Sequence, residues 1–565
     1  MGEIHIQTDQ LQVVPGLVGG FIFVLGLCSL ITKERLFLSE TLLSMVFGII
    51  VGPQVLNWMD PSRWSSNEYQ LTQEFSRYAL AIEVMIAGVT LPKKYLLKEW
   101  KSVLILLLPV MASMWLVSAA VFKFTFSISL VHALAVGACV APTDPVLANA
   151  ILKGMFAESH VPLRLRNILT AESGANDGLG YPFLFFALYL MRLGGGKAIG
   201  TWIYATWLYQ VALSVLIGSV TGYICRKALR YAETAGWVDK ESFLSSSITL
   251  ALLLVGVCTI VGTDDILCCF VAGNSFTWDD WFRVETEDTG LQETMNGLVS
   301  MSFFIYFGTI IPWHSYTTAN LLHPWRIFIA VLLIMTLRRL PVLMASYRLI
   351  PAIRTWQDAL FAGWFGPIGV SAVFYSIETI KQLDMYEDSN GGRVATIVYP
   401  IVCAVVFGSV LVHGVTIPLV LMGKRVKTTI SVSASSIWNQ PGGLGLSAWY
   451  NDKRQRRQHH GGDAAGRPDD EAPGSQPPPE PAYLGPDTGL AVADGGPSSS
   501  LETGGRHMRR SRNPNDTLTE LAPPAAASDD LVSSLQPPDS IADDGGLFMN
   551  ARRNISPGHT IIFDR

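Results

Sequence analysis

Cysteine is scarce in this sequence, with seven residues in 565. Every cysteine lies in an apolar stretch, and none has the loop spacing of a zinc site or a disulfide framework. We therefore expect buried thiols rather than a metal site or a disulfide scaffold. The seven are Cys28, Cys139, Cys225, Cys258, Cys268, Cys269 and Cys403.

Apolar residues are scarce after about residue 423, where Gly, Pro, Ser, Asp and Arg predominate. Such a composition cannot bury enough apolar surface for a core, so residues 424–565 are predicted to be a largely disordered tail. The first residues lack the basic region and the small-residue cleavage site of a secretory signal. We expect a short N-terminus, residues 1–10, followed by a retained hydrophobic segment. The formal net charge of −5 averages these unlike regions and indicates little.

Residues 11–423 have the opposite composition, with about thirteen apolar segments separated by short charged loops. Most segments are roughly twenty residues long, the length that matches a bilayer. The pattern predicts an all-α polytopic membrane protein. The segments lie near 11–31, 36–57, 77–91, 102–122, 129–151, 167–191, 203–225, 243–262, 264–276, 293–313, 325–346, 358–377 and 395–422.

Lysine and arginine are divided unevenly among the loops. The odd-numbered loops hold clusters such as Lys93, Lys94 and Lys98, and basic residues also follow the last segment. The even-numbered loops hold few. Because basic loops stay in the cytoplasm, the pattern predicts an external N-terminus and a cytoplasmic tail.

The stretch GACVAPTDPVLANA, residues 137–150, interrupts one apolar segment. Pro142 and Pro145 break helical hydrogen bonding, and the carboxylate of Asp144 costs about 2.5–3.5 kcal/mol in a membrane interior. A later segment, ALFAGWFGPIGVSAVF, has a similar opening and its own proline. Interrupted helices at matching positions of two halves indicate a transporter site near the midplane, here within six-helix inverted repeats.

The segment after the double proline carries Glu172, Ser173, Asn176 and Asp177. At about 100° per residue these side chains share one polar face, and Asp177 could meet Asp144. Oxygen ligands suit a hard monovalent cation, with carbonyl ligands added by the unwound backbone. Since desolvation penalises a charged carboxylate, such a group would hold a proton or a cation in turn, as exchange requires. The alternative is that these polar residues only join helices.

Glu172 needs a partner if it stays ionised in the membrane, and Arg338 or Arg339 could provide one. The alternative is that both arginines lie near a cytoplasmic end and snorkel. Glu83 is a further carboxylate in an apolar segment without an evident partner, and its role stays open.

A second acidic group, Asp264 and Asp265, opens a short apolar segment. Thr263 or Asp264 could cap that helix, or the pair could belong to the route of a cation.

The motifs APTDP, AESGANDGLGYPF, TDD and SFTWDDWFR together resemble the fungal plasma-membrane sodium/proton antiporters of the monovalent cation:proton antiporter superfamily. The resemblance covers roughly residues 10–425 and implies a dimerisation part and a six-helix core with two crossed, unwound helices. It matches Thr143-Asp144 to the unwound peptide, and Asn176-Asp177 to the pair whose aspartate alternates between proton and cation.

The resemblance also matches Glu172 and Ser173 to the residues before that pair, and Arg338 to the arginine that pairs with the glutamate. Asp264 and Asp265 match a secondary acidic pair.

The function so implied is exchange of cytosolic Na+, with Li+ and K+ as further candidates, for external H+ by alternating access. We expect Na+ at Asp177, Asp144, Thr143 and Ser173, a homodimer in the lipid of the plasma membrane, no cofactor, no nucleic acid and no enzymatic activity. A cation channel is an alternative, but no repeated pore loop is visible. An intramembrane aspartyl enzyme is another, but its Gly-x-Gly-Asp motif is missing.

Overall fold

The computed structural model describes residues 10–29, 31–32, 38–145, 148, 161–287, 289–318, 322–384 and 391–438. Within these ranges the chain forms helices and their connections, with no strand, which confirms the all-α class. The predicted disordered tail lies outside the described residues from 439 onward, as do residues 1–9 of the predicted N-terminus.

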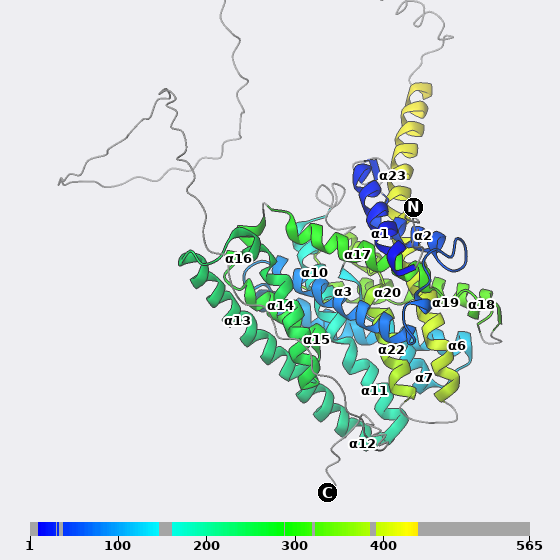
Figure 1. The fold of residues 1–565 in the computed structure, drawn as a ribbon. Helices are drawn as coiled ribbons and strands as arrows, with labels where there is room; N and C mark the ends of the chain where they lie inside the picture. Colours follow the sequence, from blue (N-terminus) through cyan, green and yellow to red (C-terminus); the bar gives the residue numbers. More distant parts are fainter. Residues whose placement is uncertain are drawn as a thin grey trace, which may run out of the picture. The chain divides into compact units, whose positions relative to one another are not determined.

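The helices follow one another along the chain with short connections (Figure 1). Each predicted apolar segment overlaps one to three consecutive helices of the described residues, and the segment at 129–151 extends beyond those residues. Their bounds are α1 Gln10–Leu27, α2 Glu40–Val51, η2 Pro61–Arg63, α3 Glu68–Thr90, α4 Tyr95–Lys98, α5 Trp100–Ile105, η3 Leu106–Val110, α6 Met111–Phe126, α7 Leu130–Cys139, α10 Leu163–Gly178, α11 Gly180–Leu193, α12 Gly195–Thr201, η4 Trp202–Ala212, α13 Leu213–Thr234, α14 Lys240–Val261, α15 Asp265–Phe276, α16 Trp281–Glu287, α17 Leu291–Ile310, α18 Ser315–Thr318, α19 Pro324–Leu337, α20 Leu340–Ser346, η5 Tyr347–Leu349, α21 Trp356–Trp364, α22 Val370–Asp384 and α23 Gly391–Trp438.

Several of these helices are long and apolar enough to cross a bilayer. Among the described residues, five meet that criterion by length and composition, and α1, α2, α7 and α15 give shorter apolar helices. The five are Trp100–Phe126, Gly195–Thr234, Lys240–Val261, Pro324–Leu349 and Val394–Thr416.

Both predicted interruptions are present. Helix α7 ends at Cys139, and residues 140–144 are not helical. Helix α21 ends at Trp364, and α22 starts only at Val370. Proline explains both breaks, because it removes a backbone donor and clashes with the preceding turn.

Helix α3 begins at Glu68. The length of the apolar segment alone predicted a start near residue 77. Asn67 caps its first turn by accepting the Gln70 N–H at 3.1 Å. The early turns carry Gln73 and Arg77, which hydropathy counts against a membrane segment. Gln73 is nevertheless buried, because it donates to Glu378 of α22 at 2.7 Å.

Glycines set the close approach of the central helices. A Cβ on Gly273 of α15 would lie 2.6 Å from the Met85 carbonyl oxygen of α3, and one on Gly88 would lie 2.6 Å from the Phe270 carbonyl oxygen. Small residues allow such contact between membrane helices. Helix α3 also packs on α10 and α22, so these elements lie side by side near the middle of Figure 1.

We expect Gly273→Val to lower the midpoint of thermal unfolding in detergent by several degrees. The added side chain would meet the α3 backbone, and overpacking of this kind costs about 1–3 kcal/mol. Gly256→Val is the control, since a Cβ on Gly256 of α14 would meet nothing within 4 Å. Equal midpoints for the two variants would contradict the close crossing of α3 and α15.

Candidate functional site

The two interrupted helices touch where both are unwound. The Asp144 N–H donates to the Pro367 carbonyl at 2.9 Å, and the Val370 N–H donates to Asp144 Oδ2 at 2.9 Å. Asp144 thus accepts a bond at the start of α22, where the helix dipole favours negative charge. Gly369 makes this possible, because a Cβ there would lie only 1.7 Å from Asp144 Oδ2.

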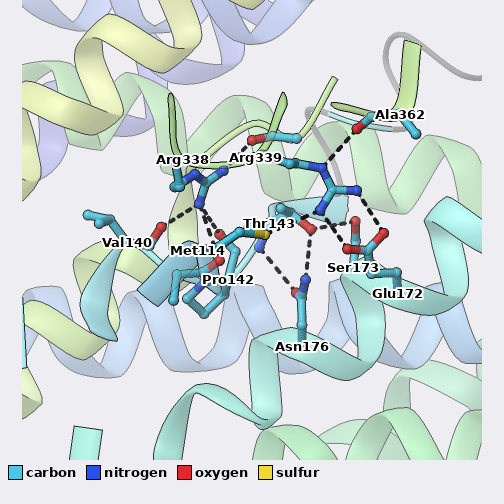
Figure 2. Close-up of polar contacts among 12 residues, drawn as sticks. Met114, Val140, Pro142, Thr143, Glu172, Ser173, Asn176, Arg338, Arg339 and Ala362 are labelled. Atoms are coloured by element: carbon cyan, nitrogen blue, oxygen red, sulfur yellow. Dashed lines mark hydrogen bonds and ion pairs between the residues drawn. The ribbon is translucent and has the colours of Figure 1, made fainter. Parts of the chain in front are cut away.

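The buried guanidinium of Arg338 lies between the two unwound segments (Figure 2). Its Nη2 donates to the Gly366 carbonyl of the second break. Its Nη1 donates to carbonyl oxygens of the first break, those of Val140, Ala141 (3.2 Å) and Pro142 (3.1 Å). The guanidinium therefore pairs with carbonyl groups of the non-helical residues that directly follow α7. These three carbonyls, expected as ligands of a transported ion, bind a side chain instead.

Glu172 pairs with Arg339, so the pairing with Arg338 implied by the resemblance is wrong. The contact is bidentate, with Arg339 Nη1 2.5 Å from Oε1 and Nη2 2.8 Å from Oε2 (Figure 2). The physical reason is the direction in which each arginine side chain points. Consecutive residues on a helix point about 100° apart, and α19 ends here, so Arg338 points toward the crossing and Arg339 toward α10.

Both arginines are buried, with 2% exposure for Arg338 and 3% for Arg339. That burial contradicts the alternative that they snorkel to a membrane surface. Arg339 Nε also donates to the Ala362 carbonyl of α21 at 2.8 Å. The ion pair consequently ties α10 to the cluster of α20 and α21.

Asn176 and Ser173 hold the unwound peptide at Thr143. The Thr143 N–H donates to Asn176 Oδ1 at 3.1 Å, and Asn176 Nδ2 donates to Thr143 Oγ1 at 2.9 Å. Thr143 Oγ1 also lies 3.0 Å from Ser173 Oγ (Figure 2). An amide suits this position because it offers an acceptor and a donor together. The three predicted residues are thus brought together, and a role in binding an ion stays a prediction.

Asp177 is fully buried, and neither carboxylate oxygen has a hydrogen-bond partner among the described residues. The Ser371 hydroxyl lies beside it, and Asp144 is close enough to interact with it electrostatically. The Tyr375 hydroxyl donates to the backbone carbonyl of Asp177, so it holds the backbone without a hydrogen bond to the carboxylate. A buried carboxylate without a partner is costly to keep charged, so a proton or another positive charge would stabilise it.

Glu83 of α3 is a second such carboxylate, and the sequence did not assign it a role. It is 2% exposed, and both its oxygens lack a partner within the part of the chain that the structure describes. Asp144 and Asp177 both act on it electrostatically. The signal was present in the sequence, as a carboxylate in an apolar segment without an evident partner. Its proximity to Asp177 depends on the packing of α3 against α10.

Asp264 caps α15, because its Oδ1 accepts the Leu267 N–H at 2.9 Å. The capping interpretation of Asp264 is therefore confirmed. Asp265 Oδ2 lies 3.4 Å from Arg77 Nε of α3, and this ion pair of a buried aspartate with a half-buried arginine was not indicated by the sequence. These two contacts stabilise the start of α15 and join it to α3, and a part for either aspartate in the cation route stays a prediction.

Two interrupted helices that cross beside buried carboxylates define a secondary-transporter type of membrane protein. The chain belongs to the transmembrane sodium/hydrogen exchanger family, whose model matches residues 20–423.

Known relatives agree with this family. The chain is 38% identical to Na(+)/H(+) antiporter 2 of Zygosaccharomyces rouxii over 76% of its own length and 55% of that protein. It is 36% identical to a Na(+)/H(+) antiporter of Saccharomyces cerevisiae over 79% of its own length and 47% of that protein. The chain thus spans about half the length of these relatives.

The fold is similar to that of a solved structure. The sodium proton antiporter MjNhaP1 from Methanocaldococcus jannaschii superposes with a TM-score of 0.55 at 19% identity. The match covers 72% of this chain and 100% of that one.

A double-mutant cycle tests which arginine forms the ion pair with Glu172. Arg339→Met leaves a buried carboxylate unpaired, and removing one partner of such a pair costs about 3–5 kcal/mol. We expect a large fall in the thermal midpoint in detergent, partly recovered when Glu172→Gln is added. The exposed pair of Arg63 with Asp60 is the control, and Arg63→Met should change the midpoint little. If Glu172→Gln instead restored the thermal midpoint of Arg338→Met, the assignment of Arg339 as the partner of Glu172 would be contradicted.

Proposed function

We propose that the protein exchanges cytosolic Na+ for external H+. The observation that carries this proposal is the carboxylate of Asp177, buried without a hydrogen-bond partner among the described residues beside two interrupted helices. A group in that position must bind a positive charge, and a proton and Na+ both qualify. The relatives are named Na(+)/H(+) antiporters, which suggests Na+ and H+ as the two exchanged ions.

Competition for Asp177 is the proposed mechanism. Na+ would displace the proton of Asp177 and take further oxygen ligands from Asp144, Thr143 and Ser173. The Thr143 and Ser173 hydroxyls already lie 3.0 Å apart, so their oxygens converge on one place. Alternating access would then carry the loaded site from one membrane face to the other. Li+, and K+ with its larger radius, are further proposed substrates.

Glu83 extends this proposal. It contributes a third carboxylate that interacts electrostatically with Asp144 and Asp177, on a helix that packs directly on α10. Hard cations prefer several oxygen ligands at once. We propose that Glu83 carries a proton or joins the ligands of the bound ion.

The setting of the site is also proposed. Residues 11–423 would form the exchanger domain, residues 1–10 an external N-terminus and residues 424–565 a cytoplasmic tail, as the basic loops predict. The protein would form a homodimer in the plasma membrane.

Proteoliposomes test the exchange directly. We expect Na+ added on one side to drive proton release in the wild type, and the apparent KM for Na+ to rise as the pH falls. Asp177→Asn should lose both the proton release driven by Na+ and the pH dependence of the KM, because a neutral amide binds neither ion by charge. Glu233→Gln is the control, since this acid lies on the exposed surface of α13.

The outcomes separate the alternatives. Exchange that persists in Asp177→Asn would place the proton carrier elsewhere. Cation movement in the wild type without proton movement would favour a channel and contradict the proposal.

Glu83→Gln should raise the apparent KM for Na+ by about tenfold to a hundredfold, which corresponds to the loss of one charged contact. The thermal midpoint should stay unchanged or rise, because the carboxylate has no partner to lose among the described residues. Glu74→Gln, on the same helix but 39% exposed, serves as the matched control. An unchanged KM in Glu83→Gln would remove Glu83 from the site.

A further inference from the structure

His413 of α23 is buried against the second interrupted helix. Its Nε2 lies 3.0 Å from the Trp364 carbonyl oxygen, at the end of α21. Its Nδ1 lies 2.8 Å from the Ser409 carbonyl oxygen and 3.3 Å from the Ser409 hydroxyl. The imidazole thus joins α23 to the last residue before the break.

The hydrogen bonds of the ring differ between its two protonation states. A neutral imidazole has one N–H, whereas a protonated one has two. With two protons the ring donates to both carbonyls. With one proton on Nε2 it keeps the bond to Trp364, and Nδ1 becomes an acceptor for which the Ser409 hydroxyl, 3.3 Å away, is the donor within reach among the described residues. Ser409 therefore changes its role at His413 when the ring gains or loses a proton.

The Ser409 hydroxyl is also a contact of the unwound segment. It accepts the Ile368 N–H at 2.8 Å, in the middle of residues 365–369. Pro367, the preceding residue, accepts the Asp144 N–H at 2.9 Å, and Val370 donates to Asp144 Oδ2 at 2.9 Å. A continuous set of hydrogen bonds consequently leads from the imidazole to Asp144.

The surroundings of His413 oppose and favour a second proton at the same time. Burial opposes a second proton, whereas the Trp364 and Ser409 carbonyl oxygens that face the two ring nitrogens would accept the N–H groups of a protonated ring. The rings of Trp364 and Phe365 lie near the imidazole in tilted orientations, with centroids 6.4 and 6.3 Å away. Helices α2, α7, α19 and α22 pack on α23, and among their described charged groups Arg338, at the end of α19, is the one acting on the ring.

We propose that His413 is a positioning residue whose protonation sets the pH range of exchange, by changing how Ser409 holds the unwound segment of residues 365–369. Histidine suits this task, because it is the side chain that ordinarily titrates between about pH 5 and pH 8. The transport consequence rests on the proposed exchange, whereas the change in the segment does not.

Hydrogen–deuterium exchange of the purified protein tests the structural part. We expect the protection of a peptide covering residues 365–370, corrected for the intrinsic rate, to change with pH between about 5.5 and 8 in the wild type. His413→Gln should remove the change, because its amide does not titrate. Ser409→Ala should lower protection about fivefold to tenfold at every pH, since the Ile368 N–H loses its acceptor. Constant wild-type protection over this range would overturn the proposal.

Transport in proteoliposomes tests the functional part. We expect His413→Gln to keep exchange at its optimum within about threefold and to lose or shift one arm of the pH profile by at least about half a unit. His323→Gln, at an exposed histidine before α19, should keep the wild-type profile. A wild-type profile in His413→Gln would overturn the proposal.

Two further outcomes are decided by the deuterium experiment. Wild-type protein that moves no Na+ against protons would refute the exchange itself, and the protection of residues 365–370 would then decide the role of His413. Should His413→Gln fail to fold, the pH dependence of protection in the wild type and the loss of protection in Ser409→Ala decide the proposal.

Discussion

The site depends on one buried cation that is part of the chain. Two helices that stop inside a membrane leave carbonyl groups without partners, and each such group costs several kcal/mol in hydrocarbon. Arg338 offsets this cost for both breaks at once, because its planar guanidinium reaches three carbonyls on one side and Gly366 on the other. A lysine has the charge but not the geometry to do the same.

Each break is also held from a neighbouring helix. Asn176 of α10 holds the first through Thr143, and Ser409 of α23 holds the second through Ile368. The backbone groups that a continuous helix would pair internally are paired here with side chains. The conformation of each unwound segment is thus sensitive to the position and the protonation of its neighbours, which a regular helix would not be.

Local features of the fold could be predicted from the sequence, because local chemistry determines them. Proline fixed the places of both breaks, Asp264 capped α15 as its position before an apolar run suggested, and helical spacing grouped Ser173 with Asn176 and Asp177. Features that depend on packing between residues far apart in the sequence could not be predicted in this way. The choice between Arg338 and Arg339 turns on which way each points at the end of α19, and the place of Glu83 turns on the contact of α3 with α10.

The guanidinium of Arg338 has a consequence for the kind of selectivity the site can have. A channel filter selects ions with rings of backbone carbonyls. Here Arg338 already occupies the carbonyls of Val140, Ala141 and Pro142, so the broken helix acts as a receptor for a side chain of its own protein. The side-chain oxygens beside the first break belong to carboxyl, hydroxyl and amide groups. If an ion binds here as proposed, we expect its discrimination to follow charge and protonation, which change with pH, rather than the radius of a carbonyl ring, which does not.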